Sequence, residues 1–242
     1  MANSYLSRTP SSTGNRRTFT ISVWLKRSRI GSPESHITNV NTGNNPYGRI
    51  LFKTDNTLKI DDYDGNQDTN IVTNRIFRDT SAWYHIVVAY DTTQSTASDR
   101  VKIYVNGVQE TSFSTATYPG LNFDTEYNNQ SKAMEIGKFS SNYFEGYMSH
   151  FAMVDGQQLT PTTFGETDST SGIWKFKSPS TTWGTNGVHL KFENSGNLGL
   201  DSSGQGNNYT VNGNLKQSLS TPSNIYGTLS NQIVPWASST VA

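Results

Sequence analysis

The sequence predicts an all-β protein, a sandwich of two antiparallel sheets, and three observations support this fold class. Apolar residues alternate with polar ones over several segments, turn-forming residues are abundant, and helix signals are almost absent. Of the 242 residues, 12% are aromatic, 33% are hydrophobic and 20 are glycines. This profile is typical of many short strands joined by turns. A chain of this length buries a core without needing disulfides or metals.

Alternation predicts where the strands lie. It is clearest over residues 18–25, and residues 83–90 and 101–105 alternate in the same way. Asn106-Gly107 predicts a type I′ hairpin turn into residues 108–113, because both turn positions require positive φ. Shorter apolar runs predict strands at 36–40, 49–53, 58–61, 70–74, 133–139, 143–154 and 188–192. The expected core residues are Trp83, Ile86, Val88, Ile103, Ile136 and Leu190.

We expect three parts in the chain: a basic arm at 1–17, a sandwich at 18–213 and an extended tail at 214–242. The single helical signal is Thr160-Pro161, an N-cap before a proline at the first helical position, and it predicts one turn at most. Residues 114–131 are predicted to be a long irregular connection. Heptads and short tandem repeats are absent from the sequence, which excludes a fibre shaft.

Both ends of the chain are candidates for docking on a partner. The first thirty residues contain six Lys or Arg and no Asp or Glu, although the formal net charge of the chain is zero. Such a run is either a solvated arm or an arm that docks on an acidic surface. The tail is aperiodic but apolar, so it packs either on its own sandwich or on a neighbouring subunit. The candidate docking residues are Arg8, Arg16, Arg17, Ile233, Val234 and Trp236.

Composition excludes several classes of function. Without cysteine there is no disulfide framework, thiolate metal site or cysteine nucleophile. The balanced charge gives no basic footprint for nucleic acid beyond the first thirty residues. No apolar signal core or segment of membrane-spanning length occurs in the sequence. We therefore expect a protein that is made in a cytoplasm, does not insert into a membrane and does not bind nucleic acid.

A set of motifs runs through the chain from about residue 5 to residue 231. The central ones are Trp83-Tyr84-His85-Ile86-Val87-Val88 and Arg100-Val101-Lys102-Ile103-Tyr104-Val105-Asn106-Gly107, and a later one is Asp201-Ser202-Ser203-Gly204-Gln205-Gly206-Asn207. Shorter ones lie at 6–12, 14–16, 146–148, 155–159, 164–168 and 221–224. Together they resemble the laminin-G-like, concanavalin A-like domain found in virion proteins of phages, especially marine ones.

The resemblance implies a jelly-roll sandwich that is circularly permuted, because residues 188–211 carry strands that come first in the usual laminin-G-like order. It also implies a structural protein of the virion, assembled from a product of the host cytoplasm. The leading interpretation is a capsid decoration, head-fibre or short fibre or knob subunit that contacts host-surface glycans. Other virion proteins and further copies of the chain are the implied partners. The alternative is a receptor-binding lectin domain of a tail fibre or tail tip.

A glycoside hydrolase is the third interpretation, since concanavalin A-like folds include glucanases. Glycosidases need a pair of carboxylates, an acid and a nucleophile or base. The nearest pattern is Glu166-Thr167-Asp168, which lacks the third carboxylate of the laminarinase-type Glu-x-Asp-x-Glu motif and follows the helical turn. The four histidines are scattered, and no Gly-x-Ser-x-Gly motif indicates a nucleophilic serine. We therefore expect a protein that is not an enzyme and has no catalytic residues.

Two candidate binding sites remain, each with a structural alternative. Asp62, Asp64, Asn66 and Asp68 place oxygens at alternate positions, as calcium loops do, but the glycine and glutamate positions of such a loop are wrong. The alternative is an Asp-Gly hairpin turn and no cofactor. Aromatic residues near the 114–131 connection are candidates for stacking on sugar rings, or else for packing within the loops. The candidate sugar-binding residues are Tyr118, Phe123, Tyr127 and Tyr143.

Overall fold

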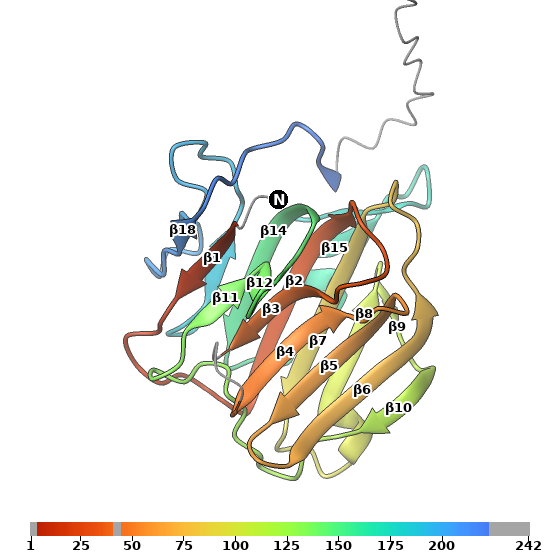
Figure 1. Ribbon diagram of the computed structural model, residues 1–242, viewed down its shortest axis with the longest axis vertical. Helices are drawn as coiled ribbons and strands as arrows, with labels where there is room; N and C mark the ends of the chain where they lie inside the picture. The colour runs from red at the N-terminus through yellow and green to blue at the C-terminus, as the bar shows by residue number, and fades with distance from the viewer. Residues whose placement is uncertain (1–3, 41–44, 223–242) are drawn as a thin grey trace, which may run out of the picture.

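The computed structural model describes residues 4–40 and 45–222, in which two large antiparallel sheets form a sandwich (Figure 1). One sheet has eight strands in the order β10-β6-β5-β4-β3-β11-β1-β18, and the other has six in the order β17-β14-β2-β7-β8-β9. The all-β prediction is confirmed. No helix in the described part of the chain is long and apolar enough to cross a membrane.

The bounds of the strands are as follows. The eight-stranded sheet contains β10 (Phe113–Thr117), β6 (Gln67–Ile76), β5 (Thr57–Tyr63), β4 (Tyr47–Phe52), β3 (Ser35–Val40), β11 (Met134–Ile136), β1 (Tyr5–Arg8) and β18 (Thr210–Asn212). The six-stranded sheet contains β17 (Val188–Leu190), β14 (Gly146–Asp155), β2 (Thr18–Arg27), β7 (Tyr84–Asp91), β8 (Val101–Val105) and β9 (Val108–Gln109). Two small hairpins pair β12 (Lys138–Phe139) with β13 (Asn142–Tyr143) and β15 (Gly165–Thr167) with β16 (Trp174–Phe176). The described 3₁₀ turns are η1 (Ala97–Asp99) and η2 (Pro161–Thr163).

The core lies between the two sheets because the strands present apolar faces to each other. On β2, Phe19, Ile21 and Val23 are buried in this core, as their alternation predicts. All six residues expected in the core are buried, the most exposed being Trp83 at 7%. The predicted helical turn is also present, as the three-residue η2.

A second apolar cluster lies on the outer face of the six-stranded sheet. Val87 of β7 and Val154 of β14 pack there with Phe164, and Trp183 packs partly against them. Phe164 and Trp183 belong to the segment that follows β14. This sheet is therefore covered on its outer face as well, which explains why Val87 is apolar although it alternates with the core residues Ile86 and Val88.

The strand predicted at 108–113 is corrected by the structure. Asn106 and Gly107 both have positive φ, as a type I′ turn requires. However, β9 ends at Gln109, and Phe113 begins β10 in the opposite sheet, where it pairs with Thr73 of β6. The chain therefore crosses between the sheets here, and residues 114–117 of the predicted irregular connection belong to strand β10.

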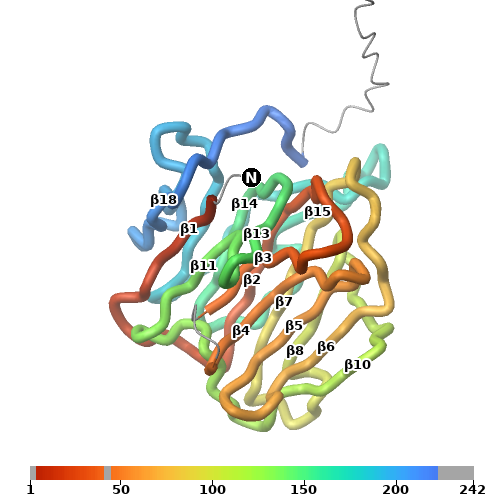
Figure 2. The backbone as a smooth tube through the Cα atoms, viewed as in Figure 1, coloured from red at the N-terminus to blue at the C-terminus, as the bar shows by residue number. Residues whose placement is uncertain are grey.

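The predicted basic arm is also corrected, because β1 lies within the eight-stranded sheet between β11 and β18 (Figure 2). Arg8 donates a hydrogen bond to the side-chain oxygen of Asn207. Arg16 forms an ion pair with Glu126 at 3.1 Å and Arg17 one with Asp124 at 2.7 Å. Each of these arginines therefore has a polar or acidic partner within the chain.

Residues 188–211 belong to the same sandwich, as we predicted. In this segment β17 is an edge strand of the six-stranded sheet, and the segment ends in β18, an edge strand of the eight-stranded sheet. The carboxylate of Asp201 fixes the connection between them, accepting hydrogen bonds from the backbone N–H groups of His189, Ser203 and Asn207 at 2.8–2.9 Å. The side chain of Asn207 in turn donates to Gly187 O at 2.8 Å. The motif at residues 201–207 thus has a structural role, because its hydrogen bonds hold the connection between β17 and β18 in place.

Replacing Asp201 with alanine is expected to lower the free energy of unfolding by about 1–3 kcal/mol, because three backbone donors lose a charged acceptor. Urea denaturation followed by fluorescence measures this change. Asp99→Ala is the matched control, since the Asp99 side chain is 44% exposed and its carboxylate forms a surface ion pair with Lys102 at 3.2 Å. Equal effects of the two substitutions would show that the motif does not fasten the strands.

The beginning of the predicted tail lies across one end of the sandwich. The side-chain amide of Gln217 donates to Phe192 O at 3.0 Å and to Glu193 O at 2.9 Å. Leu215 is partly buried against the core. The predicted docking residues Ile233, Val234 and Trp236 lie outside the described residues.

Candidate functional site

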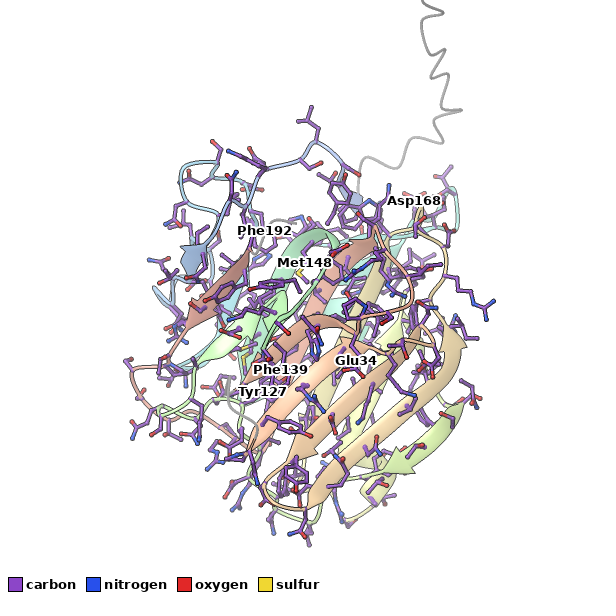
Figure 3. The ribbon with its side chains drawn as sticks, viewed as in Figure 1. Glu34, Tyr127, Phe139, Met148, Asp168 and Phe192 are labelled. Atoms are coloured by element: carbon purple, nitrogen blue, oxygen red, sulfur yellow. The ribbon has the colours of Figure 1, made fainter. Side chains whose placement is uncertain are left out.

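A group of aromatic and charged side chains lies on the outer face of the eight-stranded sheet. Alternation along β4 and β5 creates it: Ile50 and Ile60 point into the core, whereas Arg49 and Asp61 point outward and are cross-strand partners. Phe139 of the β12–β13 hairpin lies over this face in Figure 3, where its ring faces the region of β3 and β4. We call the set Tyr47, Arg49, Asp61, Tyr63 and Phe139 the outer-face cluster.

The aromatic members of the outer-face cluster are held by one another and by Arg49. Tyr47 and Tyr63 stack with ring centroids 5.4 Å apart and an interplanar angle of 17°. The Arg49 guanidinium carbon lies 4.1 Å from the centroid of Tyr47 and 5.0 Å from that of Phe139. Such stacking fixes the rings in place at little entropic cost on binding. All three rings keep part of their surface exposed.

The polar members surround one buried carboxylate. Asp61 is fully buried and forms ion pairs with Arg49 and with Lys59 Nζ, the latter at 3.2 Å. The side-chain amide of Gln67 donates to Asp61 at 2.5 Å. Two cations and an amide therefore compensate the charge of Asp61 and hold it in one position, as a preorganised hydrogen-bonding site requires.

Several buried polar atoms on this face have no hydrogen-bond partner among the described residues. They include Arg49 Nε, Asn70 Oδ1 and both ring nitrogens of His36. Asn70 is the cross-strand partner of Asp61, so it belongs to the same face. Burial, followed by the nearby Arg49, lowers the pKa of His36 to about 3, so the ring is neutral at pH 7.

The sequence did not single out the outer-face cluster. The available signal was the spacing of Tyr47 with Arg49 and of Lys59, Asp61 and Tyr63, which puts each set on one face of a strand. The two sets are brought together only by the register of β4 with β5, in which Tyr47 lies opposite Tyr63.

The four aromatic residues predicted to bind sugar do not form one platform. Tyr127 is fully buried and packs 5.2 Å from Phe19 between the sheets, which corrects its predicted role. Tyr118 packs partly against the core, and Phe123 is held through its carbonyl, which accepts from Thr92 at 2.8 Å. Tyr143 is half-buried on β13, beside Tyr5.

The predicted calcium loop is likewise corrected. Asp62 points into the core, where its carboxylate accepts a hydrogen bond from the Tyr90 hydroxyl at 2.8 Å. Asp64 and Asn66 are exposed in the turn of the β5–β6 hairpin, in which Gly65 has a φ of +120°. The Asp68 carboxylate lies beside Asp64 and accepts a hydrogen bond from its backbone N–H at 3.2 Å. Asp62 points away from both, so the four oxygen-bearing side chains do not converge on one point. Within residues 4–40 and 45–222, no group of three or more His, Cys, Asp or Glu is arranged to hold a metal ion.

The carboxylates considered for hydrolysis lie on or beside the β15–β16 hairpin, where Lys175 pairs with both. Its Nζ is 2.9 Å from Asp168 and 3.5 Å from Glu166. Hydrogen bonds from the Ser171 backbone N–H and from Lys175 hold the pKa of Asp168 well below its ordinary value. A general acid of a glycosidase needs a raised pKa instead.

In the part of the chain that the structure describes, one serine side chain is hydrogen-bonded to a histidine ring, Ser22 to His85, but the histidine is the donor and cannot activate the serine as a nucleophile. The indole N–H of Trp174 donates to His85 Nδ1 at 3.0 Å. Nδ1 is therefore an acceptor, and in the neutral ring the proton lies on Nε2, which donates to Ser22 Oγ at 2.8 Å. Burial lowers the pKa of His85 to about 3, so the neutral form persists at pH 7. His85 therefore has no lone pair facing Ser22 to accept its proton.

The comparisons with known proteins identify the family. A family model described as the concanavalin A-like lectin/glucanases superfamily matches residues 2–163, and the chain belongs to this superfamily. No curated protein matches it.

Among solved structures, the heptameric SAP-like pentraxin of Limulus polyphemus is 15% identical, with a TM-score of 0.46 over 77% of this chain and 85% of that one. Domain 4 of the GH43 arabinanase AbnA from Geobacillus stearothermophilus, in complex with arabinotriose, is 17% identical, with a TM-score of 0.41 over 62% of this chain. The match spans 65% of that domain, and a match to the mouse laminin alpha1 domains LG4-5 spans 39% of theirs. These similarities concern the fold.

Proposed function

We propose that the chain is a glycan-binding module without hydrolytic activity, and that the outer-face cluster is its binding site. The carrying observation is the set of partly exposed rings, Tyr47, Tyr63 and Phe139, which are held in place by stacking and by the Arg49 guanidinium. A sugar presents a C–H face to such rings and hydroxyl groups to the polar side chains beside them. Membership of the lectin/glucanase superfamily is consistent with this proposal.

Screening the full chain on a glycan array, followed by calorimetry of the best ligand, tests the proposed site. Tyr63→Ala is expected to weaken binding by roughly two- to tenfold, because an aromatic contact is worth about 0.5–1.5 kcal/mol. Tyr147→Ala is the matched control, since Tyr147 is 40% exposed on β14 of the other sheet. Chelation of divalent cations is expected to leave binding unchanged. Binding that survives Tyr63→Ala and Arg49→Gln would place the sugar elsewhere.

The absence of hydrolysis is tested separately, by measuring the reducing ends released from a panel of polysaccharides. We expect none above background, because Glu166 and Asp168 are both paired with Lys175. Release of reducing ends by the wild type that is abolished by Glu166→Gln would instead support the glycoside hydrolase.

We further propose that the module is a structural protein of a phage virion, carried as a capsid decoration or short fibre subunit in several copies. The support is the sequence resemblance to phage virion proteins. A receptor-binding lectin domain of the tail is the second candidate, favoured by the same outer-face cluster. Cryo-electron microscopy of particles locates the domain on the head or on the tail. If complete wild-type particles contain no copy of the chain, both assignments are wrong.

A further inference from the structure

A cavity of about 300 Å³ opens at the end of the sandwich that residues 215–221 cross. Its walls come from both sheets, with Leu6 of β1 and Ile136 of β11 on one side and Met148 of β14 on the other. Phe192, which follows β17, closes a further side. In Figure 3 the labelled Met148 and Phe192 lie at the same end of the molecule, below the segment that crosses it. The cavity is separate from the outer-face cluster and shares none of its residues.

The cavity has an apolar wall together with polar and charged groups. Leu6, Ile136 and Leu198 are buried, and Phe144 and Leu215 are partly buried around it. A volume of about 300 Å³ is at the lower end of the range for small-molecule sites, which are mostly apolar with a few polar groups that orient the ligand. The cavity therefore suits a small molecule with an apolar body.

Two amines belong to the lining of the cavity. Lys191 forms one loose ion pair, its Nζ 4.0 Å from a Glu193 carboxylate whose side chain is 71% exposed. Lys216 has no ion pair among the described residues within 4.0 Å and is exposed on the crossing segment. His150 also lines the cavity, and burial, more than nearby Lys191, lowers its pKa to about 4, so it is neutral at pH 7. Glu193 also belongs to the lining, so Lys191, Lys216 and Glu193 together give it a net charge of +1, which favours an anion.

The wall also contains an unusual backbone conformation. Phe192 has a φ of +61°, which is rare for a bulky residue and costs roughly 1–3 kcal/mol. His150, on the neighbouring strand β14 of the same sheet, has a φ of +47° at the bulge of that strand. Among the described residues, the other non-glycine residues with positive φ are Asn or Ser. The two larger side chains held in this conformation both line the cavity, and such conformations concentrate at ligand sites.

We propose that this cavity binds a small amphipathic anion, with an apolar body of the size of a medium-length acyl chain and a carboxylate held by Lys191 and Lys216. The apolar body lies between Leu6, Ile136 and Met148, where it removes apolar surface from water. The carboxylate lies at the rim, where the two amines meet it with part of its hydration retained. This site does not depend on the proposed glycan function.

The test uses the full chain with decanoate and the neutral decanol as probes, each measured by displacement of 1-anilinonaphthalene-8-sulfonate and by calorimetry. We expect both probes to bind. The double variant Lys191→Gln/Lys216→Gln is expected to weaken decanoate binding by about tenfold while decanol binding stays within twofold. Lys132→Gln/Lys177→Gln is the matched control, because neither lysine lines the cavity, and it should change neither probe.

A second variant tests the place of the apolar body. Leu215→Trp puts a larger side chain on the crossing segment and is expected to weaken both probes at least tenfold, with an unchanged melting temperature showing that the fold persists. The proposal is overturned if neither probe binds or if Leu215→Trp leaves both affinities unchanged. It is also overturned if binding occurs only after residues 223–242 are deleted, because the cavity would then be closed to such ligands in the full chain.

Discussion

Ile103→Ala is expected to lower the free energy of unfolding by about 2–5 kcal/mol, through lost burial and the cavity that it leaves. Ile103 is 1% exposed at the centre of β8, opposite Val88 of β7, and belongs to the main core between the sheets. Close packing from both sheets limits how far its neighbours can move into the space. Chemical denaturation followed by tryptophan fluorescence measures the loss.

Val108→Ala is the matched control, because Val108 lies on the neighbouring strand β9 and is 65% exposed. It removes methyl groups from the same sheet and is expected to change the free energy of unfolding by about 0.5 kcal/mol or less. If Ile103→Ala costs no more than Val108→Ala, the core does not depend on β8 as the structure indicates.

The strands could be predicted from the sequence because a sandwich strand buries one face, and this produces alternation at a period of two. The prediction was most accurate at β2, β7 and β8, which are neighbours in the middle of one sheet. It was less accurate at Glu110, where the chain leaves one sheet for the other while the sequence still reads as a strand. Alternation reports that a face is buried and does not report which sheet buries it.

The candidate site was harder to predict because contacts between distant segments create it. Tyr127 belongs to a polar connection, yet it fills core space beside Phe19, more than a hundred residues earlier in the chain. Conversely, Tyr47 and Tyr63 read as ordinary strand residues, and only the register of two strands stacks them. Arg16 and Arg17 read as a free basic arm because the acidic residues that pair with them follow so late in the sequence.

Replacing Asp62 is expected to change how the free energy of unfolding depends on pH. Burial raises its pKa to about 7, and the hydrogen bond from Tyr90 opposes this only in part. In the unfolded chain an aspartate has a pKa of about 3.9. Between about pH 4 and pH 7 the native state therefore holds a proton that the unfolded state has lost. The contribution of Asp62 to the free energy of unfolding is fully present below pH 4. It is lost as the pH rises from 4 through 7, at about 1.4 kcal/mol per pH unit.

Asp62→Asn removes this titration and keeps an acceptor for the Tyr90 hydroxyl. The free energy of unfolding of the variant, minus that of the wild type, is expected to increase by about 3 kcal/mol as the pH rises from 5 to 8. The four histidines act in the opposite direction in both proteins, because burial lowers each pKa to about 3 or 4 and stability then rises with pH up to about 6.5. The contribution of the histidines cancels in the difference between the free energies of unfolding of the variant and the wild type. This difference is measured by urea denaturation at intervals of half a pH unit.

Asp64→Asn is the control for removing a carboxylate from the same hairpin, since Asp64 is exposed in the turn two residues later. Tyr90 and Tyr127 face Asp62 from β7 and from the long connection, and burial holds the pKa of both well above the ordinary value, so neither ionises in this pH range. Asp68 also titrates in this range, because burial and the neighbouring Asp64 raise its pKa to about 6. Asp64→Asn therefore also measures how much of the pH dependence comes from this pair. A stability difference that does not change with pH, or that changes equally for both variants, would show that the buried carboxylate is ionised throughout. Asp62 would then be a permanent charge between the sheets, with Tyr90 as its hydrogen-bond donor.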